Sequence, residues 1–287
     1  MPTAPRACAD KPVRRWFITG ASSGLGRALT AYALDRGDHV TATVRRPAAL
    51  DGLRDSHGDR LTVELLDVTH PGQVEEVIAR TLAAGPVDIV VNNAGYAVMG
   101  AAEEMTVEQV RHQLETLLVA PLLITRSFLA PMREQGGGRV IQISSLGGQA
   151  ALAASSAYHA AKWGLEGYSE SVSHEVAGFG IHLTVVQPGA TRTGFGSAVR
   201  YTDETAAYRD TPVGEMRRWV ATADDSVFTG DPAKLAAAIY ETTRQAVPPL
   251  RLTLGADAYE AVHEALTGRI AALEAQQSVA ASVGFAD

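Results

Sequence analysis

The chain has 287 residues, of which 46% are apolar and 20% are charged, and its formal net charge is -7 at pH 7. These values predict one soluble globular domain with a well-buried core, and the acidic balance argues against nucleic acid and anionic membrane surfaces as partners. Cys8 is the only cysteine, which excludes a disulfide framework and a cysteine-rich metal site. The histidines form no H-E-x-x-H pattern that would indicate a zinc hydrolase.

The two ends of the chain are predicted to be tails. Residues 1–12 are polar and contain proline without the apolar segment of a signal peptide, so we expect them to be disordered. Residues 276–287 are rich in small residues and predict a second tail. Counted as uninterrupted apolar runs, no segment approaches the ~20 residues that cross a bilayer. We therefore expect a cytoplasmic protein with no membrane partner.

Between the tails, apolar and β-branched runs alternate with segments of helical periodicity. In chain order, strands are predicted over 13–19, 39–44, 61–66, 87–91, 140–143, 181–186 and 250–254. Helices are predicted over 25–36, 74–84, from 106 towards 129, and over 155–176, 233–246 and 259–275. Most of these strands are apolar on both faces. The pattern predicts a single α/β domain over 13–275, with a doubly wound parallel sheet of about seven strands and helices on both faces.

A glycine-rich turn links the first strand to the first helix. Gly20 permits a tight turn, Gly24 lets a ligand approach the backbone, and Gly26 lets helix and strand pack closely. A turn of this kind at a helix N-terminus suits a phosphate group. The same residues also match G-x-S-x-G, in which Ser22 would be a hydrolase nucleophile. We disfavour that reading because the upstream strands and oxyanion loop of a hydrolase are missing.

Other polar or glycine-bearing sequences follow the remaining strands, at 45, 67, 93–95, 144–145 and 188–189. Ligands of such sheets bind outside the carboxyl ends of the strands. Any one of these sequences is compatible with an ordinary turn. Because they converge on one edge of the sheet, together they indicate a site.

Tyr158 and Lys162 lie four residues apart, so they are neighbours on one helical face. A nearby cation lowers the pKa of a phenol from its usual value near ~10, which would let Tyr158 exchange a proton near neutral pH. Lysine occurs only at 11, 162 and 234, whereas arginine is common, which favours a functional role over a surface pair. Ser145, at the end of the fifth strand, is placed to hydrogen-bond a carbonyl or alcohol oxygen, although a simple turn is an open alternative.

These motifs together resemble the short-chain dehydrogenase/reductase family. The matching sequences are TGASSGLG at 19–26, NNAG at 92–95, Ser145, the Tyr158-x-x-x-Lys162 pair and PGATRT at 188–193. They occur in the family's order and spacing and cover roughly residues 13–193.

The resemblance implies a Rossmann domain that binds NAD(H) or NADP(H) and transfers hydride between nicotinamide and a carbonyl or alcohol carbon. By position, Tyr158 would be the general acid/base, Ser145 would orient the substrate oxygen, and Lys162 would lower the pKa of Tyr158 and hold the nicotinamide ribose. The implied cofactor-binding residues are Gly20, Ser22, Ser23, Gly24, Leu25, Gly26, Arg45, Asp67, Val68, Asn93, Ala94, Gly95, Tyr158, Lys162, Pro188, Gly189, Thr191 and Thr193.

The end of the second strand bears on the choice of cofactor. NAD-preferring members place an acid there, whereas this chain has Val44 followed by Arg45 and Arg46. An arginine pairs with a 2′-phosphate in a fork geometry, so we predict NADP(H), with Arg45 as the main contact. The alternative is that both arginines form a solvated strand end.

One position departs from the family. Leu117 stands where the family commonly has an asparagine that opens the long helix for a proton-relay water. A cofactor-binding regulatory protein with impaired catalysis therefore stays open. A separate alternative is an epimerase or dehydratase on the same fold.

Residues 190–230 contain aromatic side chains among polar ones and predict a lid over a medium-sized, largely apolar ketone, aldehyde or secondary alcohol. By analogy with the family, we expect a homodimer or homotetramer.

Overall fold

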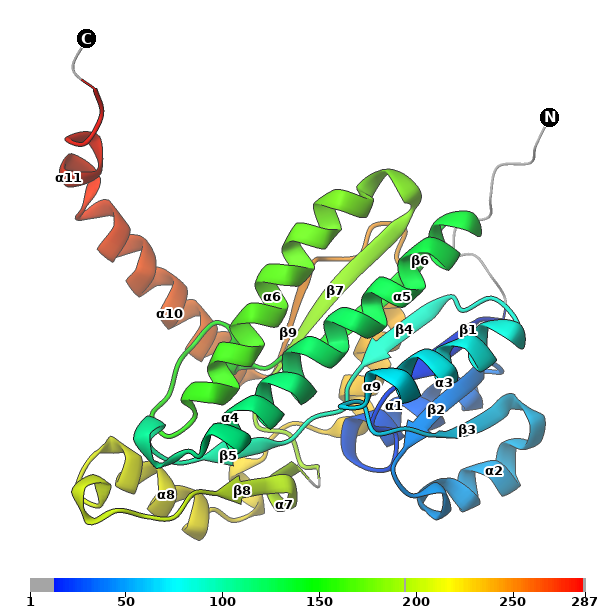
Figure 1. The fold of residues 1–287 in the computed structure, drawn as a ribbon, viewed down its shortest axis with the longest axis horizontal. Coiled ribbons are helices and arrows are strands. Elements are labelled where there is room, and N and C mark those ends of the chain that lie inside the picture. The colour runs from blue at the N-terminus through cyan, green and yellow to red at the C-terminus, as the bar shows by residue number, and fades with distance from the viewer. Residues whose placement is uncertain (1–12, 194, 286–287) are drawn as a thin grey trace.

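A parallel sheet of seven strands lies at the centre of the computed structural model, which describes residues 13–193 and 195–285 (Figure 1). The strand order is β3-β2-β1-β4-β6-β7-β9, and every neighbouring pair is parallel. The strands are β1 (Arg15–Ile18), β2 (His39–Val44), β3 (Leu61–Leu65), β4 (Ile89–Asn92), β6 (Gly138–Ile143), β7 (Ile181–Pro188) and β9 (Arg251–Leu254). The order reverses between β1 and β4, which is the switch point where ligands of such sheets bind.

Helices cover both faces of the sheet, because successive side chains of a strand point to opposite faces. Trp16 and Ile18 of β1 pack in one cluster with α1 (Gly24–Asp35) and α9 (Pro232–Thr243). Phe17, between them, packs in a second cluster with α3 (Pro71–Ala83), α5 (Ala120–Glu134) and α6 (Ser156–Val176). The predicted doubly wound α/β architecture is therefore confirmed.

The remaining α-helices of the described residues include predicted and unpredicted ones. They are α2 (Asp51–His57), α4 (Val107–Leu114), α7 (Phe195–Ala198), α8 (Pro212–Thr222), α10 (Ala256–Glu274) and α11 (Gln277–Ala281), and α4 and α10 overlap stretches predicted as helical. Of these, α2 lies in a stretch without an assigned element and α11 lies within the expected tail 276–287. In Figure 1, α10 and α11 project away from the sheet. The expected N-terminal tail, with Cys8, lies outside the described residues.

The predicted lid begins and ends at one place. Thr191 forms a parallel bridge with Gly230, and Arg192 N donates to Gly230 O at 2.8 Å. Between these points β8 (Val199–Tyr201) pairs in parallel with β5 (Ala97–Met99), a short strand that follows the NNAG sequence. The segment thus attaches to the carboxyl edge of the sheet at its base and again at β5.

The stretch Val107–Glu134 is long and apolar enough to cross a membrane by length and composition alone. Counting only uninterrupted apolar runs missed it. In the structure, however, Ile124, Phe128 and Met132 of this stretch are buried in the cluster on the sheet. The stretch therefore packs as a core helix of the domain.

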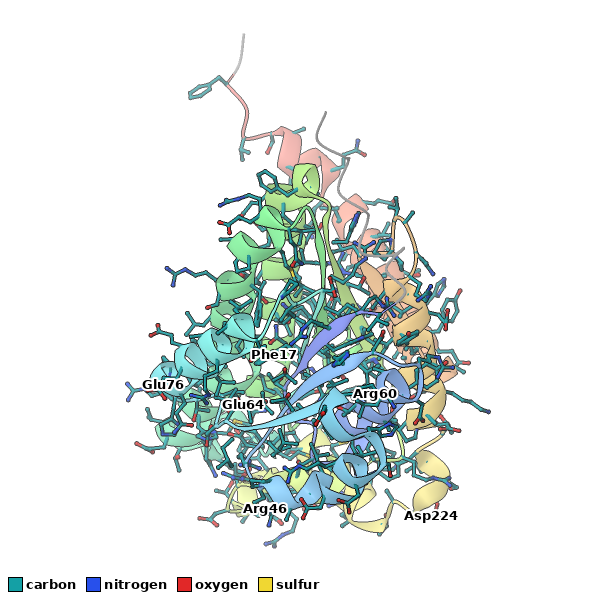
Figure 2. All side chains as sticks on the ribbon, turned by 90° about the vertical axis from the view of Figure 1, so that its right-hand side faces the viewer. Phe17, Arg46, Arg60, Glu64, Glu76 and Asp224 are labelled. Atoms are coloured by element: carbon teal, nitrogen blue, oxygen red, sulfur yellow. The ribbon has the colours of Figure 1, made fainter. Side chains whose placement is uncertain are left out.

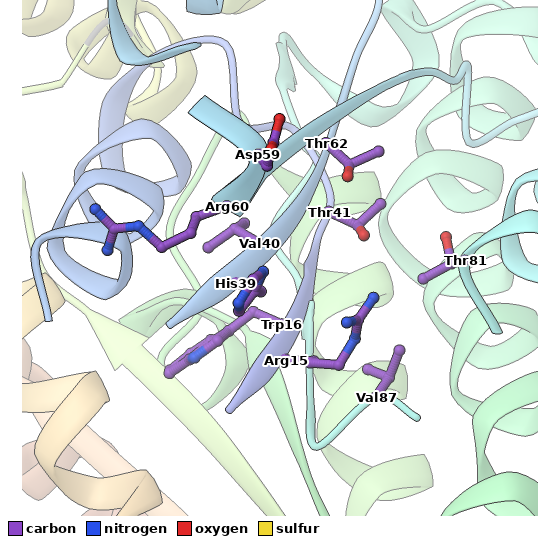
Figure 3. A pocket seen from close by; sticks show the side chains of 10 residues that line it. All are labelled: Arg15, Trp16, His39, Val40, Thr41, Asp59, Arg60, Thr62, Thr81 and Val87. Atoms are coloured by element: carbon purple, nitrogen blue, oxygen red, sulfur yellow. The ribbon is translucent and has the colours of Figure 1, made fainter. Parts of the chain in front are cut away.

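The motif residues lie at the carboxyl ends of the strands, whereas a hollow lies at their amino ends. Figure 2 places Arg46, just after β2, and Asp224 of the lid segment at the same lower end of the molecule, with Phe17 in its interior. A hollow at the other edge is lined by residues at or near the starts of strands, among them Arg15, His39 and Arg60 (Figure 3). Arg60 there donates to Leu34 O at 2.6 Å, at the end of α1. The motif residues belong to the first of these two edges.

Candidate active site

The glycine turn after β1 is shaped for close approach of backbone. Gly20 and Gly24 have φ of +67° and +55°, a region that side chains other than glycine rarely adopt. A Cβ on Gly20 would lie 2.7 Å from Ala94 Cα, and one on Gly24 would lie 3.1 Å from Thr193 Cβ. A Cβ on Gly26 would collide with the Asn93 amide and with Gly20 O. The turn therefore has no room for larger residues.

Asn93 ties the end of β4 to this turn. Its Nδ2 donates to Thr19 O at 2.9 Å and to Gly20 O at 3.1 Å. The backbone N–H groups of Asn93 and Ala94 donate to Thr19 Oγ1 at 2.9 and 3.1 Å. Asn93 and Ala94 thus support the glycine turn, a role that the motif spacing alone did not distinguish from cofactor contact.

The N-terminus of α1 opens directly behind the turn. Ser23 is its N-cap residue with extended backbone, and among the described residues no side chain caps this end. The first N–H groups of a helix lack intrahelical partners and attract anions. The glycine cradle and this helix end together fit a phosphate-bearing cofactor such as the one the motifs imply.

Tyr158 and Ser145 meet at the carboxyl edge of the sheet. Tyr158, half-buried on α6, hydrogen-bonds the Ser145 side chain, which lies just after β6. Ser145 Oγ also accepts from Gly147 N at 3.0 Å. A side chain at Gly147 would crowd Tyr158 Cε1 at 3.2 Å. The turn after β6 thus holds the serine against the phenol.

Lys162 lies one helical turn after Tyr158 and is only 6% exposed. Its Nζ donates to Ile143 O, the last residue of β6, at 2.6 Å and lies 5.7 Å from the Tyr158 ring centroid. Burial lowers the pKa of Lys162 to about 8, although the negative charge of Glu166 opposes that shift. The lysine is thus a buried cation whose titration lies close to neutral pH.

The pKa of Tyr158 moves opposite to the expected direction. Burial raises it, and the hydrogen bond with Ser145 lowers it by less. Lys162 does not lower the pKa of Tyr158 as expected, because its ammonium group donates to Ile143 O rather than to the phenol. Tyr158 is therefore protonated at neutral pH in this arrangement, which is the form required of a general acid.

The ends of β2 and β3 lie side by side. Arg45 is exposed, Asp67 is half-buried, and Val68 is 8% exposed. Burial raises the pKa of Asp67, but hydrogen bonds from Thr69 and the charges of His70 and Arg45 outweigh it, so the net shift is downward. Arg45 therefore lies close enough to Asp67 to affect its charge, at the edge where the sequence predicts a 2′-phosphate contact.

The PGATRT sequence follows β7. Pro188 is the last residue of that strand, and a side chain on Gly189 would collide with the Asp257 carboxylate, which accepts from Ala190 N at 2.7 Å. Thr191 pairs with Gly230 at the base of the lid. Thr193 reaches the glycine turn at Gly24. This sequence therefore connects the lid to the turn, while Gly189 and Thr191 have structural contacts of their own.

The helix does open at Leu117 without the family asparagine. Glu115–Val119 form a π-helical turn between α4 and α5, and Ala120 N donates to Glu115 O, five residues back. Pro121 has no N–H to continue that pattern, which leaves the carbonyl of Thr116 without a donor from this residue. Leu117 is 1% exposed and lies against Gly95. The π turn and the proline, rather than an asparagine, account for the opening.

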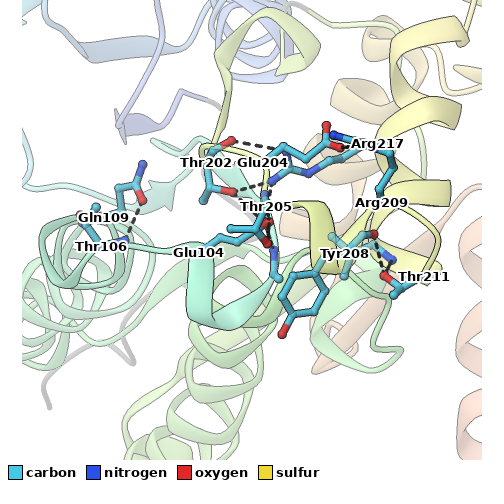
Figure 4. A network of polar contacts seen from close by, with 12 residues as sticks. Glu104, Thr106, Gln109, Thr202, Glu204, Thr205, Tyr208, Arg209, Thr211 and Arg217 are labelled. Atoms are coloured by element: carbon cyan, nitrogen blue, oxygen red, sulfur yellow. Dashed lines mark hydrogen bonds and ion pairs between the residues drawn. The ribbon is translucent and has the colours of Figure 1, made fainter.

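A carboxylate that no motif indicated fastens the lid (Figure 4). Glu104 Oε1 accepts from Thr205 N and Oγ1 at 2.8 and 3.0 Å, and Oε2 accepts from Arg217 Nη2 at 2.7 Å. Oε2 also accepts from Ala101 N at 2.8 Å and Thr202 Oγ1 at 3.2 Å. Burial raises the pKa of Glu104, but these hydrogen bonds outweigh it and lower the pKa to about 2. We call this cluster the Glu104 latch.

The sequence and the fold of this chain are similar to those of known proteins. The family described as short chain dehydrogenase matches residues 14–204. "Oxidoreductase BOA17" of Botryotinia fuckeliana is 38% identical over 248 residues, which cover 85% of this chain and 90% of that protein. The crystal structure of a short-chain dehydrogenase from Streptomyces avermitilis superposes with a TM-score of 0.88 at 42% identity, over 94% of this chain and 100% of that one. A serine dehydrogenase in complex with NADP+ superposes with a TM-score of 0.71 at 27% identity, over 84% of this chain and 94% of that one.

Proposed function

The chain belongs to the short-chain dehydrogenase family, and from that premise we propose that it is an NADP(H)-dependent oxidoreductase that interconverts a ketone or aldehyde with an alcohol. Oxidoreductase activity and a nicotinamide cofactor come with the family. The choice of NADP(H), the reacting group and the roles of individual residues are the proposal.

One observation carries it: the hydrogen-bonded Tyr158 and Ser145 share the carboxyl edge of the sheet with the buried Lys162. Tyr158 holds a proton at its phenol oxygen near neutral pH, ready to deliver it to a carbonyl oxygen as that oxygen gains charge. Ser145 Oγ lies beside the phenol and orients the same oxygen by hydrogen bonding. Lys162 supplies a positive charge that stabilises Tyr158 after it has lost its proton.

The residues present fit a dinucleotide. The glycine turn and the uncapped end of α1 would hold its phosphates, Asp67 and Val68 would face its adenine, and Lys162 would hold the nicotinamide ribose. When bound, the nicotinamide ring supplies or accepts hydride. Thr193, which touches the turn at Gly24, would contact the carboxamide from the lid side.

Arg45 supports NADP(H) over NAD(H). It is exposed after β2, next to Asp67, and Val44 occupies the strand end where an acid would repel a 2′-phosphate. A guanidinium group binds phosphate through two parallel hydrogen bonds. Similar structures have been solved with NADP+ and with NAD, so the choice rests on Arg45 and Val44.

Exposed apolar side chains of the turn after β6 and of the predicted lid support a largely apolar substrate. Leu152, Tyr201 and Trp219 are 51%, 48% and 52% exposed, and they belong to the turn after β6 and to the lid. Exposed apolar side chains beside polar groups are typical of small-molecule sites. We propose a medium-sized, largely apolar ketone, aldehyde or secondary alcohol as substrate.

A carbonyl panel assayed with NADPH and NADH tests the proposal. Wild-type protein should oxidise NADPH with at least one apolar ketone or aldehyde and prefer it over NADH. Arg45→Glu should lower the ratio of the two kcat/KM values by about 10- to 100-fold, because a charge-assisted contact is replaced by repulsion. Arg54→Glu, an equal charge change on α2, should leave the ratio unchanged. A wild-type preference for NADH would overturn the choice of cofactor, and no turnover of any carbonyl would overturn the reaction.

A further inference from the structure

A buried carboxylate lies one helical turn beyond Lys162 on α6 and has no role in the function proposed above. Glu166 is 1% exposed, and residues four apart on a helix are neighbours on one face. Burying a carboxylate is unfavourable unless it is paired and hydrogen-bonded. Its partners therefore indicate what it does.

Every partner of Glu166 in the described part of the chain donates to it. Oε1 accepts from Ser144 Oγ at 2.9 Å and from Gln187 Nε2 at 3.0 Å. Oε2 accepts from Gln187 Nε2 at 2.9 Å, Gln149 Nε2 at 2.5 Å and Arg251 Nε at 3.1 Å. A set made only of donors matches the ionised carboxylate, which only accepts.

These partners come from separate elements that meet under the candidate site. Ser144 directly precedes Ser145, and Gln149 closes the turn that follows it. Gln187 lies near the carboxyl end of β7, and Arg251 begins β9. A side chain on Gly148 would collide with Glu166 Oε1. One carboxylate thus joins the helix that carries the phenol to the turn that carries the serine.

We propose that Glu166 is a positioning residue of the active site, which fixes the turn at Ser145 against α6 and places a negative charge one helical turn from the buried Lys162. The inference rests on the proposed function, because it assigns Glu166 to the same reaction. Glu166 acts through Ser144 and Lys162 and touches no reacting atom.

The charge of Glu166 should raise the pKa of Lys162. Burial favours the neutral amine of Lys162, and the charge of Glu166 opposes that effect. Removing the carboxylate therefore lowers the pKa of Lys162 below about 8. The other charged or titratable groups around this network are Arg251, Glu170, Tyr158, His159, and Arg269, which reaches it through Gln149.

The chain offers matched variants. Glu166→Gln keeps the shape and removes the charge. Arg251→Gln removes the cation that partly neutralises Glu166, so it should shift the pKa of Lys162 the other way. Glu170 lies one turn further along α6, is exposed, and also pairs with Arg251. Glu170→Gln therefore removes a negative charge that is further from Lys162 and serves as the control.

NMR of protein with isotope-labelled lysine measures the titration of the Lys162 side chain and does not require turnover. The chain has lysines only at 11, 162 and 234, so the side-chain signals are few and Lys162→Arg assigns the one of interest. Glu166→Gln should lower the Lys162 midpoint by about 1 pH unit, Arg251→Gln should raise it, and Glu170→Gln should leave it within a few tenths of a unit. An unchanged midpoint in Glu166→Gln would overturn the inference. Should Glu166→Gln not fold, an unchanged midpoint in the more exposed Arg251→Gln would overturn it instead.

The pH profile of kcat/KM for carbonyl reduction adds a functional readout. Loss of the Lys162 charge should contribute to its alkaline limb, so that limb should move to lower pH in Glu166→Gln, in the same direction as the NMR midpoint. Wild-type protein that turns over no carbonyl would refute the proposed function, while the NMR midpoints would still decide the role of Glu166.

Discussion

The glycine turn and the predicted lid, residues 190–230, meet at Gly24 and Thr193 but are held in place by different means. The turn is shaped by missing side chains: Gly20, Gly24 and Gly26 bring backbone against Ala94, Thr193 and the Asn93 amide. The lid is fastened by present side chains, with Glu104 accepting from Thr205 and Arg217, 101 and 113 residues away. The first arrangement makes a rigid cradle, and the second makes an attachment that one substitution can loosen.

The largest effect is expected at Tyr158, which belongs to neither region. Tyr158→Phe removes the proton donor while keeping the ring, so kcat should fall by about 10²- to 10⁴-fold. NADPH affinity and melting temperature should stay near the wild-type values, because neither the turn nor the Glu104 latch is altered. Steady-state kinetics and NADPH fluorescence titration measure both. A variant with wild-type kcat would remove Tyr158 from the mechanism.

A substitution in the turn should act on cofactor binding. In Gly26→Ala the new methyl collides with Gly20 O and the Asn93 amide, which should displace the loop and weaken NADPH binding at least tenfold, with a loss of about 1–3 kcal/mol in stability. Gly72→Ala, at a helical glycine of α3 with open space around it, is the control and should change neither. Calorimetric titration and thermal unfolding report the two quantities. Unaltered NADPH affinity in Gly26→Ala would mean that the close approach is not needed.

This difference explains what the sequence could and could not predict. The turn, the Tyr158–Lys162 pair, and the strand and helix that carry them were predicted because glycine spacing and i, i+4 pairs are local patterns. The Glu104 latch, the β5–β8 pairing and the Glu166 network join residues distant in the chain, through ordinary acids and threonines with no characteristic spacing. The predicted lowering of the Tyr158 pKa was also wrong. The burial of Tyr158 and the hydrogen bond from Lys162 to Ile143 O arise only in the folded chain.

A substitution in the Glu104 latch should act on the lid. Glu104→Gln leaves Arg217 without its ionic partner, so the substrate KM should rise several-fold while NADPH affinity is retained. Glu75→Gln, the same change at an exposed acid of α3, is the control. Because the folded pKa of Glu104, about 2, lies below its ordinary value of 4.5, its contribution to stability is complete above about pH 4.5 and is lost as the pH falls through about 2. The melting temperatures of wild type and variant should therefore converge near pH 2, and a difference that persists there would contradict the latch.

The last of these substitutions concerns the pH dependence of stability at Lys162. Its folded pKa, about 8, lies below its ordinary value of 10.5, so between these values the unfolded chain binds a proton that the folded chain does not. Stability relative to Lys162→Met should therefore rise with pH from about 8 to about 10.5. Thermal unfolding at pH 7 and pH 10 measures it, with Lys234→Met as the control. A stability difference between wild type and Lys162→Met that is independent of pH would show that folding does not lower the pKa of Lys162.

The most direct test of the central claim follows a labelled hydride. Wild-type protein incubated with an apolar ketone and NADPH deuterated at C4 of the nicotinamide should give an alcohol one mass unit heavier, at a rate that falls by about 10²- to 10⁴-fold in Tyr158→Phe. Mass spectrometry of the product provides the answer. A product without deuterium, formed while the labelled cofactor is left intact, would contradict hydride transfer and point instead to an epimerase or dehydratase reaction on this fold.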